Sequence, residues 1–343
     1  AARNLNTMNI RTWETPVGVA YGMDHGWLAK TTDGWDTKTN SPFNSGQEPL
    51  LSLGGEPIAM AAWSDGSFCL IGNTRILTMD SFTSAPVVRL ESAEGFSIAH
   101  SFYESGGQRI VLAGEYNHAD LSSKRLYLSR DGGLTFSVVR QTVDGAGSVN
   151  NHWHATAYDP WGGALWASAG DDTKPPRELS FSLDWGVTWS SLTAPADRHL
   201  QPTAIMPFPA RMVFGRDSGG FAPGLDWWER PVSGGQPEGG QALAPGLMTF
   251  APDLSAYQVY PDTSTWCIGR NSDECYILFP PRGTGRGAIY ATGDGGRSWH
   301  RVADVTRAGS WKLASDGVRV ILAKVDPARE VWSAPLLTWD WTA

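Results

Sequence analysis

Residues 129–136 of this chain read SRDGGLTF, and this short stretch decides the fold. It holds a hydroxyl residue, an aspartate, a glycine and an aromatic residue at fixed spacing. The same spacing returns at residues 182–189, SLDWGVTW, and at residues 292–299, TGDGGRSW. Three separate matches to the pattern Ser/Thr-x-Asp-x-Gly-x-Thr/Ser-aromatic predict a structural unit that repeats along the chain.

Each residue type in this pattern suits a tight turn between two strands. The aspartate accepts backbone N–H groups and fixes the loop, while the hydroxyl residue two positions earlier can bond back across the turn. The glycine supplies a positive φ at little cost, and the final aromatic residue enters the next strand and packs between sheets. Asp131, Asp184 and Asp294 are therefore interpreted as structural residues and not as catalytic acids.

The pattern resembles the Asp-box, also called the BNR repeat, of the sialidase-like β-propellers. This resemblance implies an all-β fold of small four-stranded antiparallel sheets arranged in a ring. Weaker copies surround Asp33, Asp80 and Asp217. The better-spaced copies recur about every 50 residues, close to the length of a propeller blade. Abundant Gly, Pro and Trp with few charged residues also favour many short strands.

The repeats divide the whole chain into blade-sized units. Their starts lie near Val17, Pro57, Phe96, His152, Thr203, Thr265 and Ser310. This predicts about seven blades, with six or eight as alternatives, in a single domain over residues 1–343. A Gly- and Pro-rich stretch at residues 234–261 is expected to be an insertion. The last unit lacks the motif, so we expect residues 5–13 to supply its outer strand and close the ring.

Composition and charge narrow the class of ligand. The formal net charge is −8, charged residues make up 18% of the chain, and no run of Lys or Arg occurs. Phosphate binding needs a basic footprint, so these values argue against nucleic acid as a partner. No apolar stretch approaches the roughly 20 residues that a membrane span needs. An oligo- or polysaccharide, bound by stacking and hydrogen bonds, fits this composition better.

The start of the chain and its cysteines bear on the compartment. The chain begins Ala1-Ala2-Arg3, with neither an initiator methionine nor a signal peptide, as in a processed protein or a trimmed chain. Cys267 and Cys275 flank a turn-like segment and are expected either to form a disulfide or to be two ordinary small core residues. We expect an extracellular, periplasmic or virion-surface protein.

The strand order of a propeller sorts its loops onto two faces. The turn between the third and fourth strands of a blade, which carries the motif, shares one face with the turn between the first and second strands. The other loops lie on the opposite face, around the mouth of the central channel, where binding sites of this fold class are found. Three such loops, residues 114–120, 150–154 and 170–178, hold a dense polar cluster.

This polar cluster supplies the candidate site. Its candidate catalytic residues are Glu115, His118, His152, His154 and Asp171. Candidate substrate contacts are Tyr116, Asn117, Trp153, Asp172 and Arg177, together with Arg282 and Arg286 from a separate Gly- and Pro-rich loop. Trp153 is the expected sugar-stacking platform, and either Arg282 or Arg286 could grip a carboxylate or sulfate of a glycan.

Three interpretations of the cluster stay open. His152 and His154 alternate along an extended strand, so together with His118 they could hold a divalent cation. Glu115 or Asp171 could instead act as general acid and base on a sugar, with a histidine as proton shuttle. The third interpretation is a solvated polar rim whose histidines only cap strand ends.

The family resemblance does not decide the function by itself. Sialidases carry an Arg-Ile/Leu-Pro motif near the N-terminus, and the nearest segment here, Arg11-Thr12-Trp13, departs from it. No sialidase catalytic residue is therefore carried over, and classical sialidase activity is not expected. We expect a glycoside hydrolase or a polysaccharide lyase. The alternative is a non-catalytic glycan or cell-surface binding module, either secreted or part of a phage tail.

Overall fold

The computed structural model is all-β over the residues that it describes, which include no helix. The described residues are 5–8, 16–24, 27–33, 37–44, 58–117, 123–142, 152–170, 178–192, 202–216, 224–230, 266–268, 271–279, 287–305, 311–324 and 331–335. The predicted insertion at residues 234–261 lies outside them.

The described strands form seven antiparallel sheets, five of four strands and two of three, which we number in chain order. The strands of the first four sheets are β1 (Leu5–Met8), β2 (Ala20–Asp24), β3 (Trp27–Thr31), β4 (Thr39–Asn44), β5 (Ala59–Ala62), β6 (Phe68–Ile71), β7 (Arg75–Met79), β8 (Val87–Glu91), β9 (Phe96–Ser105), β10 (Gln108–Glu115), β11 (Arg125–Ser129), β12 (Ser137–Gln141), β13 (Trp153–Asp159), β14 (Ala164–Ala169), β15 (Glu178–Ser182) and β16 (Ser190–Leu192). The strands of the last three sheets are β17 (Pro202–Pro207), β18 (Arg211–Arg216), β19 (Leu225–Glu229), β20 (Trp266–Ile268), β21 (Cys275–Phe279), β22 (Gly287–Thr292), β23 (His300–Val305), β24 (Trp311–Ser315), β25 (Arg319–Lys324) and β26 (Val331–Pro335).

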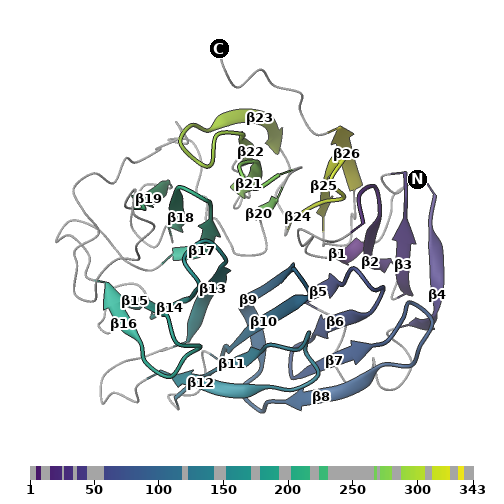
Figure 1. Cartoon of the computed structure of the whole chain (residues 1–343). Helices are drawn as coiled ribbons and strands as arrows, with labels where there is room; N and C mark the ends of the chain where they lie inside the picture. Colours follow the sequence, from purple (N-terminus) through teal and green to yellow (C-terminus); the bar gives the residue numbers. More distant parts are fainter. Residues whose placement is uncertain are drawn as a thin grey trace.

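The sheets stand around a common centre (Figure 1). The first strand of each sheet lies nearest that centre, and the chain then runs outward through the sheet. Neighbouring first strands touch: β13 contacts both β9 and β17, β24 contacts both β20 and β1, and β1 also contacts β5. The prediction of an all-β, propeller-like arrangement of small antiparallel sheets is thereby confirmed.

The apolar core lies between neighbouring sheets. Ala155, Trp166 and Leu179 of the fourth sheet pack with Ile205 and Phe214 of the fifth. Other buried clusters join the first sheet to the second, the second to the third, the third to the fourth, the fifth to the sixth and the sixth to the seventh. Inner strands are therefore apolar on both sides, because each sheet is covered on both faces.

The predicted closure of the ring by residues 5–13 is wrong. β1 pairs with β2 in the first sheet, with Leu5 opposite Asp24. This pairing satisfies backbone groups on the inner edge of the first sheet that would otherwise lack partners. The first and last sheets instead meet side by side. β1 contacts β24 and β25, and the Gly18 N–H donates to the Asp316 carbonyl oxygen at 2.6 Å.

The two cysteines of the sixth sheet are not cross-linked. Cys267 lies opposite Tyr276 in the β20–β21 pair, whereas Cys275 lies opposite Ile268. Cys275 is a buried free thiol, and its Sγ lies 3.8 Å from Met206 Sδ. Of the two expectations for this pair, the disulfide is wrong, and Cys275 is an ordinary core residue.

The three repeated turns at residues 129–136, 182–189 and 292–299, which we call the aspartate turns, share one hydrogen-bond pattern. Asp131 Oδ1 accepts the Ser129 hydroxyl at 2.7 Å and the Thr135 N–H at 3.0 Å, while Oδ2 accepts the Thr135 hydroxyl at 2.6 Å. The same three bonds recur at Asp184 and Asp294. Both carboxylate oxygens are thus engaged within the turn.

The weaker copies of the motif differ from one another. Asp33 has the pattern of the aspartate turns: Oδ1 accepts the Thr31 hydroxyl at 2.8 Å, and Oδ2 accepts the Thr37 hydroxyl at 2.6 Å. Asp80 does not, and its exposed side chain has no hydrogen bond or ion pair with any described residue. Asp217 lies outside the described residues. The two hydroxyl residues at the matching positions around Asp80 bond elsewhere, because Thr78 accepts from Arg89 Nε at 2.7 Å and Ser84 donates to the Ser81 carbonyl oxygen at 3.0 Å.

Each aspartate turn packs against the sheet that precedes it in the chain. Gly186 has a φ of 89°, and a Cβ at this position would lie 2.5 Å from Val139 Cβ in the third sheet. Trp189, the aromatic residue of the same turn, donates its Nε1–H to the Val139 carbonyl oxygen at 3.0 Å. The glycine of the motif is therefore needed both for its positive φ and for the close approach of the neighbouring sheet.

Candidate functional site

The candidate site lies at the end of the sheets opposite the aspartate turns. In the fourth sheet, Trp153 pairs with Ala169 at one end, and Leu165 pairs with Ser182, where the aspartate turn begins, at the other. We call these two ends the site face and the turn face. His152 immediately precedes β13 and so lies on the site face, as the strand order predicts.

An irregularity in β13 brings His152 and His154 together. The pairing of β13 with β14 shifts register between Trp153 and Ala155, as at a β-bulge, so His154 leaves the regular alternation. The Nε2 atoms of the two histidines lie 2.8 Å apart, and the rings stack at a centroid distance of 4.6 Å and an angle of 23°. Bulges re-aim side chains in this way and are common beside functional sites.

The two histidines form one buried hydrogen-bonded pair. A hydrogen bond between two imidazole nitrogens requires one protonated and one unprotonated Nε2, so the pair holds a proton between its rings. The exposed fractions of His152 and His154 are 0% and 3%. The Tyr116 ring packs edge-on against His152, with a centroid distance of 4.1 Å and an angle of 64°. These three residues form the described centre of the candidate site.

Glu115 ends β10 and is completely buried. Its Oε1 accepts the Ser92 hydroxyl at 2.6 Å and the Tyr127 hydroxyl at 2.9 Å, and its Oε2 accepts the Arg125 N–H at 2.7 Å. Burial, followed by the hydrogen bond to Glu115, raises the pKa of Tyr127 to about 12. The predicted role of Glu115 as a general acid or base does not fit these contacts, because the carboxylate holds the third sheet together and has no exposed oxygen.

Sequence reasoning misses a second polar group beside Glu115. Lys124 is completely buried, and its Nζ lies 2.9 Å from Glu94 Oε2. Asn117, a predicted substrate contact, donates from Nδ2 to the same carboxylate oxygen at 3.3 Å. Lys124 and Glu94 belong to no motif. Their positions just outside strands of the third sheet are the one signal that could have pointed to them.

Trp153 is wrongly predicted as a sugar-stacking platform. Its exposed fraction is 0%, and its Nε1–H donates to the Lys124 carbonyl oxygen at 3.1 Å. Gly114 makes room for it, because a Cβ at Gly114 would lie 2.5 Å from Trp153 Cβ. Trp153 is therefore a core residue that joins the third and fourth sheets, and neither face of its ring is open to a sugar.

Six predicted residues lie outside the described part of the chain. They are His118, Asp171, Asp172, Arg177, Arg282 and Arg286. Among the residues that the structure does describe, no group of three or more His, Cys, Asp or Glu side chains is placed to hold a metal ion. His152 and His154 would supply two ligands to a cation, and His118 stays the predicted third.

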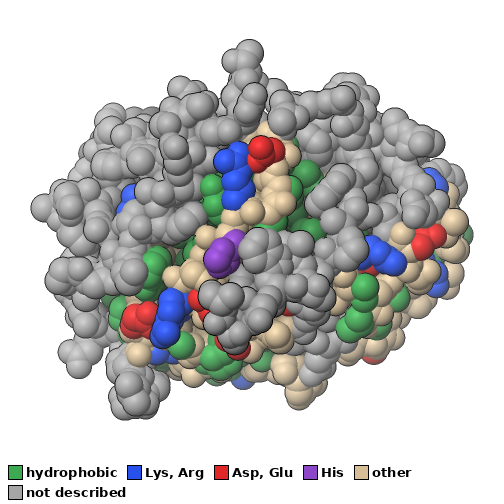
Figure 2. All heavy atoms as spheres, turned by 90° about the horizontal axis from the view of Figure 1, so that it is seen from above, with side chains coloured by type: hydrophobic (Ala, Val, Ile, Leu, Met, Phe, Trp, Pro, Cys, Tyr) green, Lys and Arg blue, Asp and Glu red, His purple; other side chains and the backbone are tan. Residues whose placement is uncertain are grey.

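Several charged side chains of the described residues lie beside partners of opposite sign. In Figure 2, Lys or Arg side chains stand next to Asp or Glu side chains at several separate places on one face. Among the described ion pairs, Arg216 Nε lies 2.7 Å from Asp226 Oδ2 and Arg216 Nη2 lies 2.5 Å from Asp226 Oδ1. The described part of this face therefore carries no extended positive patch. Over the described residues, the structure contains no helix of the length and hydrophobicity that a membrane crossing requires.

No protein-family model matches the chain. A curated relative, vacuolar protein sorting/targeting protein 10 of Komagataella phaffii (strain GS115 / ATCC 20864), is 31% identical over 163 residues. This match covers 42% of the present chain and 10% of the relative, so the chain spans about a tenth of that protein.

Solved structures of several proteins have the same architecture. The GH74 xyloglucanase of Xanthomonas campestris has a TM-score of 0.64 and 14% identity, covering 98% of this chain and 52% of that one. The oligogalacturonate lyase of Vibrio parahaemolyticus has a TM-score of 0.60 and 9% identity, covering 98% and 91%. YCF48 of Cyanidioschyzon merolae has a TM-score of 0.57 and 13% identity, covering 94% and 92%. Together with the ring of antiparallel sheets, these likenesses identify the fold of the chain as a β-propeller.

Proposed function

We propose that this protein is a carbohydrate-active β-propeller of the Asp-box group, with its glycan site on the site face around His152 and His154. Two proteins of the same architecture are named for their action on glycans, a xyloglucanase and an oligogalacturonate lyase. The hydrogen-bond pattern shared by the aspartate turns supports the Asp-box assignment. The seven described sheets support seven blades in one domain. We also propose that the protein is extracellular, periplasmic or on a virion surface, because a glycan ligand would be met there.

The observation that carries the proposal is the convergence of the two histidine Nε2 atoms at 2.8 Å. Imidazole is the side chain used most often for general acid–base catalysis, because it exchanges protons near neutral pH. In a hydrogen-bonded pair of neutral rings, one ring can take a proton from the substrate at Nδ1 and pass its Nε2 proton to the other ring, which then supplies its own Nδ1 proton to the departing group. The pair thus holds both halves of a proton-transfer reaction in one place.

Elimination fits the described site better than hydrolysis. Most glycoside hydrolases use two carboxyl groups that flank the scissile bond. The described carboxylates of Glu94, Glu115 and Glu178, at the site-face end of the third and fourth sheets, are all engaged, with Lys124, Tyr127 and Arg140 respectively. We therefore infer a polysaccharide lyase that acts on an acidic glycan.

An elimination would proceed as follows at this site. An imidazole removes the proton on the carbon next to the uronate carboxyl group, the adjacent C–O bond to the leaving sugar breaks, and a C=C bond forms. The leaving oxygen takes its proton from the second imidazole. Arg177, Arg282 and Arg286 are the proposed contacts to the uronate carboxylate, because a guanidinium binds a carboxylate in a bidentate manner.

A non-catalytic glycan-binding module is the second candidate, and the burial of the histidine pair favours it. The rings have exposed fractions of 0% and 3%, which suits a structural pair at the site-face end of β13. In this second candidate function, the histidine pair only stabilises the backbone at the start of β13, and other side chains contact the sugar.

Turnover of a defined glycan panel separates the two candidates. The purified protein is incubated with polygalacturonate, alginate and hyaluronan as acidic glycans, and with xyloglucan as a neutral one. The lyase proposal predicts ultraviolet absorbance of unsaturated products from at least one acidic glycan. New reducing ends without that absorbance would indicate a hydrolase. Binding without either signal would establish the non-catalytic module, and the absence of binding to the whole panel would refute both.

Variants then test the histidine pair directly. We expect His152→Asn and His154→Gln each to lower turnover by about 100-fold or more, the scale of a lost general acid or base. The matched control is His300→Asn, which removes an exposed histidine of β23 next to an aspartate turn. Circular dichroism of each variant shows whether the loss reflects chemistry or unfolding. Wild-type turnover in both pair variants would remove the pair from the site.

A further inference from the structure

The irregularity that brings His152 and His154 together is repeated in the fifth sheet. The pairing of β17 with β18 shifts register between Pro202 and Ala204, so Thr203 is the inserted residue, as His154 is in β13. Both strands are the innermost of their sheets, and they lie side by side around the centre (Figure 1). Thr203 therefore has the same place in the fifth sheet that His154 has in the fourth.

A short series of contacts joins the two inserted residues. Ser168 of β14 lies opposite Ala155, the residue that follows His154. The Ser168 hydroxyl donates to the Pro202 carbonyl oxygen at 2.5 Å, and Pro202 directly precedes Thr203. This buried hydrogen bond fixes the start of β17 against the fourth sheet. Thr203 thus lies on the site face, at the same contact between sheets as the histidine pair.

The Thr203 hydroxyl is buried without a hydrogen bond. The exposed fraction of the residue is 6%. Within the described part of the chain, no hydrogen-bond partner lies near Oγ1, and no other buried hydroxyl oxygen is in this condition. An unpaired buried hydroxyl lowers stability, whereas a valine of the same shape would fill the position without that cost. Such a group in a native protein therefore indicates a partner that arrives from outside the chain.

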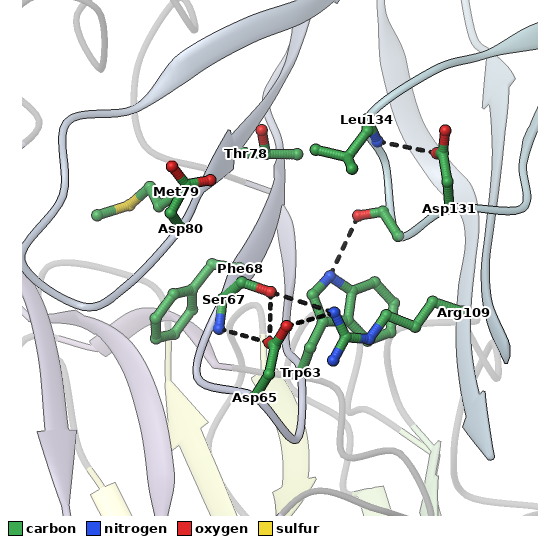
Figure 3. A pocket seen from close by; sticks show the side chains of 11 residues that line it. Trp63, Asp65, Ser67, Phe68, Thr78, Met79, Asp80, Arg109, Asp131 and Leu134 are labelled. Carbon is green, nitrogen blue, oxygen red and sulfur yellow. Dashed lines mark hydrogen bonds and ion pairs between the residues drawn. The ribbon is translucent and has the colours of Figure 1, made fainter. Parts of the chain in front are cut away.

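Polar groups on the turn face show the more common situation. A pocket of about 190 Å³ lies there between the second and third sheets, and dashed lines in Figure 3 mark the hydrogen bonds and ion pairs in its wall. The Trp63 Nε1–H donates to the Gly132 carbonyl oxygen at 3.1 Å, and Arg109 Nη1 lies 2.7 Å from Asp65 Oδ2. These groups have partners within the protein and need no ligand, unlike the Thr203 hydroxyl.

We propose that the Thr203 hydroxyl binds a ring hydroxyl of the glycan beside the histidine pair, an inference that rests on the proposed function of the site face. A sugar hydroxyl both donates and accepts, so it can pair with the threonine hydroxyl in either direction. Because Oγ1 is buried, the glycan must displace the atoms that cover it, and the bond forms only in the complex. Thr203 thereby determines specificity, since a sugar without the matching hydroxyl leaves the threonine unpaired.

The first test needs no glycan. Thr203→Val removes the hydroxyl and keeps the shape of the side chain, so we expect the free protein to unfold about 1–4 °C above the wild type. Thr156→Val is the matched control, because Thr156 is buried in β13 and its hydroxyl donates to Ser101 Oγ at 3.2 Å. This control should unfold at a lower temperature. A lower unfolding temperature for Thr203→Val would mean that its hydroxyl is already paired in the free protein, which would overturn the proposal.

The second test measures binding of polygalacturonate, alginate, hyaluronan and xyloglucan by calorimetric titration. Thr203→Val should bind the glycan that the wild type binds about 3–10-fold more weakly, the scale of one lost hydrogen bond. Thr203→Ser keeps a hydroxyl and should bind with close to wild-type affinity, as should Thr156→Val. Where the wild type turns the glycan over, kcat/KM replaces affinity and should fall by the same factor.

His154→Gln separates this inference from the proposed function. Weaker binding in His154→Gln with wild-type affinity in Thr203→Val would overturn the role of Thr203 and leave the site around the histidine pair. Weaker binding in Thr203→Val with wild-type affinity in His154→Gln would instead keep Thr203 as a glycan contact and remove the histidine pair from the site.

Discussion

The sulfur of Cys69 fills the space that a side chain on Gly133 would need, because a Cβ at Gly133 would lie 2.7 Å from Cys69 Sγ. Cys69 belongs to β6 of the second sheet, and Gly133 to the aspartate turn of the third, with a φ of 97°. The same relation joins Gly296 to Val213, at 2.8 Å from Val213 Cγ2. The glycine of each aspartate turn is thus a point of contact between two sheets.

Gly133→Ala should lower the free energy of unfolding by about 2–4 kcal/mol, since it adds the cost of a positive φ to that of overpacking. Gly66→Ala is the matched control. Gly66 also has a positive φ, 86°, but nothing lies within 4 Å of its Cβ position, so about 1–2 kcal/mol is expected there. Urea unfolding measures both changes. Cys69→Ala should recover part of the loss in Gly133→Ala, and strictly additive effects of the two substitutions would contradict the contact.

The aspartate turns should weaken in acid. Hydrogen bonds from the Thr188 hydroxyl and N–H lower the pKa of Asp184 from 3.8 to about 2. A carboxylate with a lowered pKa stabilises the fold above its unfolded pKa, and that contribution disappears as the pH falls through the folded value. Asp184→Asn should therefore unfold at a lower temperature than the wild type at neutral pH, and the gap should close between about pH 4 and pH 2. Thermal unfolding across this range measures the effect, and a constant gap would contradict it.

Glu115→Gln should destabilise the protein by about 1–3 kcal/mol, because an amide NH₂ group replaces one of two oxygens that together accept from three donors. The same substitution removes the negative charge beside Tyr127, so the pKa of Tyr127 should fall from about 12 toward 10. Chemical unfolding gives the first value, and ultraviolet titration of the tyrosinate gives the second, with Tyr127→Phe identifying the signal. A variant with lowered turnover and unchanged stability would restore a catalytic role for Glu115.

Trp185 has a left-handed backbone conformation that glycine would adopt at a lower cost in free energy. In the described part of the chain it is the one non-glycine residue with a positive φ, 61°, and Gly132 and Gly295 hold the matching positions in the other two turns. Its ring stacks on Tyr158 at 5.5 Å, and the Arg130 guanidinium carbon lies 4.0 Å from its ring centre.

Trp185→Gly should therefore be destabilising by only about 1 kcal/mol, since relief of the backbone partly offsets the lost stacking. Arg130→Gln should cost about 0.5–1 kcal/mol in the wild type and close to nothing once Trp185 is absent. A double-mutant cycle in urea tests the coupling, and a zero coupling term would rule out the cation–π contact in solution.

The fourth sheet shows how far the sequence alone leads. Alternating apolar residues between turn signals predict strands at residues 154–158, 164–168 and 178–182, and the observed β13, β14 and β15 match these closely. The same pattern predicts a fourth strand at residues 187–191. The observed β16 begins later, at Ser190, because the aspartate turn uses residues up to Trp189. Local periodicity and turn chemistry suffice for such elements.

The predictions made from the sequence fail where the packing of segments distant in the sequence decides the structure. Trp153 stands between two histidines, and Glu115 begins the segment Glu115-Tyr116-Asn117-His118, so the sequence suggests a surface for both. Both are completely buried in the sheet contacts. The shift of register next to Trp153 and the approach of Gly114 depend on packing between the third and fourth sheets. The inner position of β1 likewise depends on which edge of the first sheet lacks a partner, and no local pattern encodes that choice.

The contact between each aspartate turn and the preceding sheet has a direction along the chain. During synthesis, a newly emerged sheet would meet a neighbouring sheet that is already folded. The glycine of its aspartate turn would then pack against that sheet. Within the ring, the first sheet packs against the seventh, which is synthesised after the other six, and joins it through Gly18 and Asp316. The junction between these two sheets should thus be the last to assemble and the first to open.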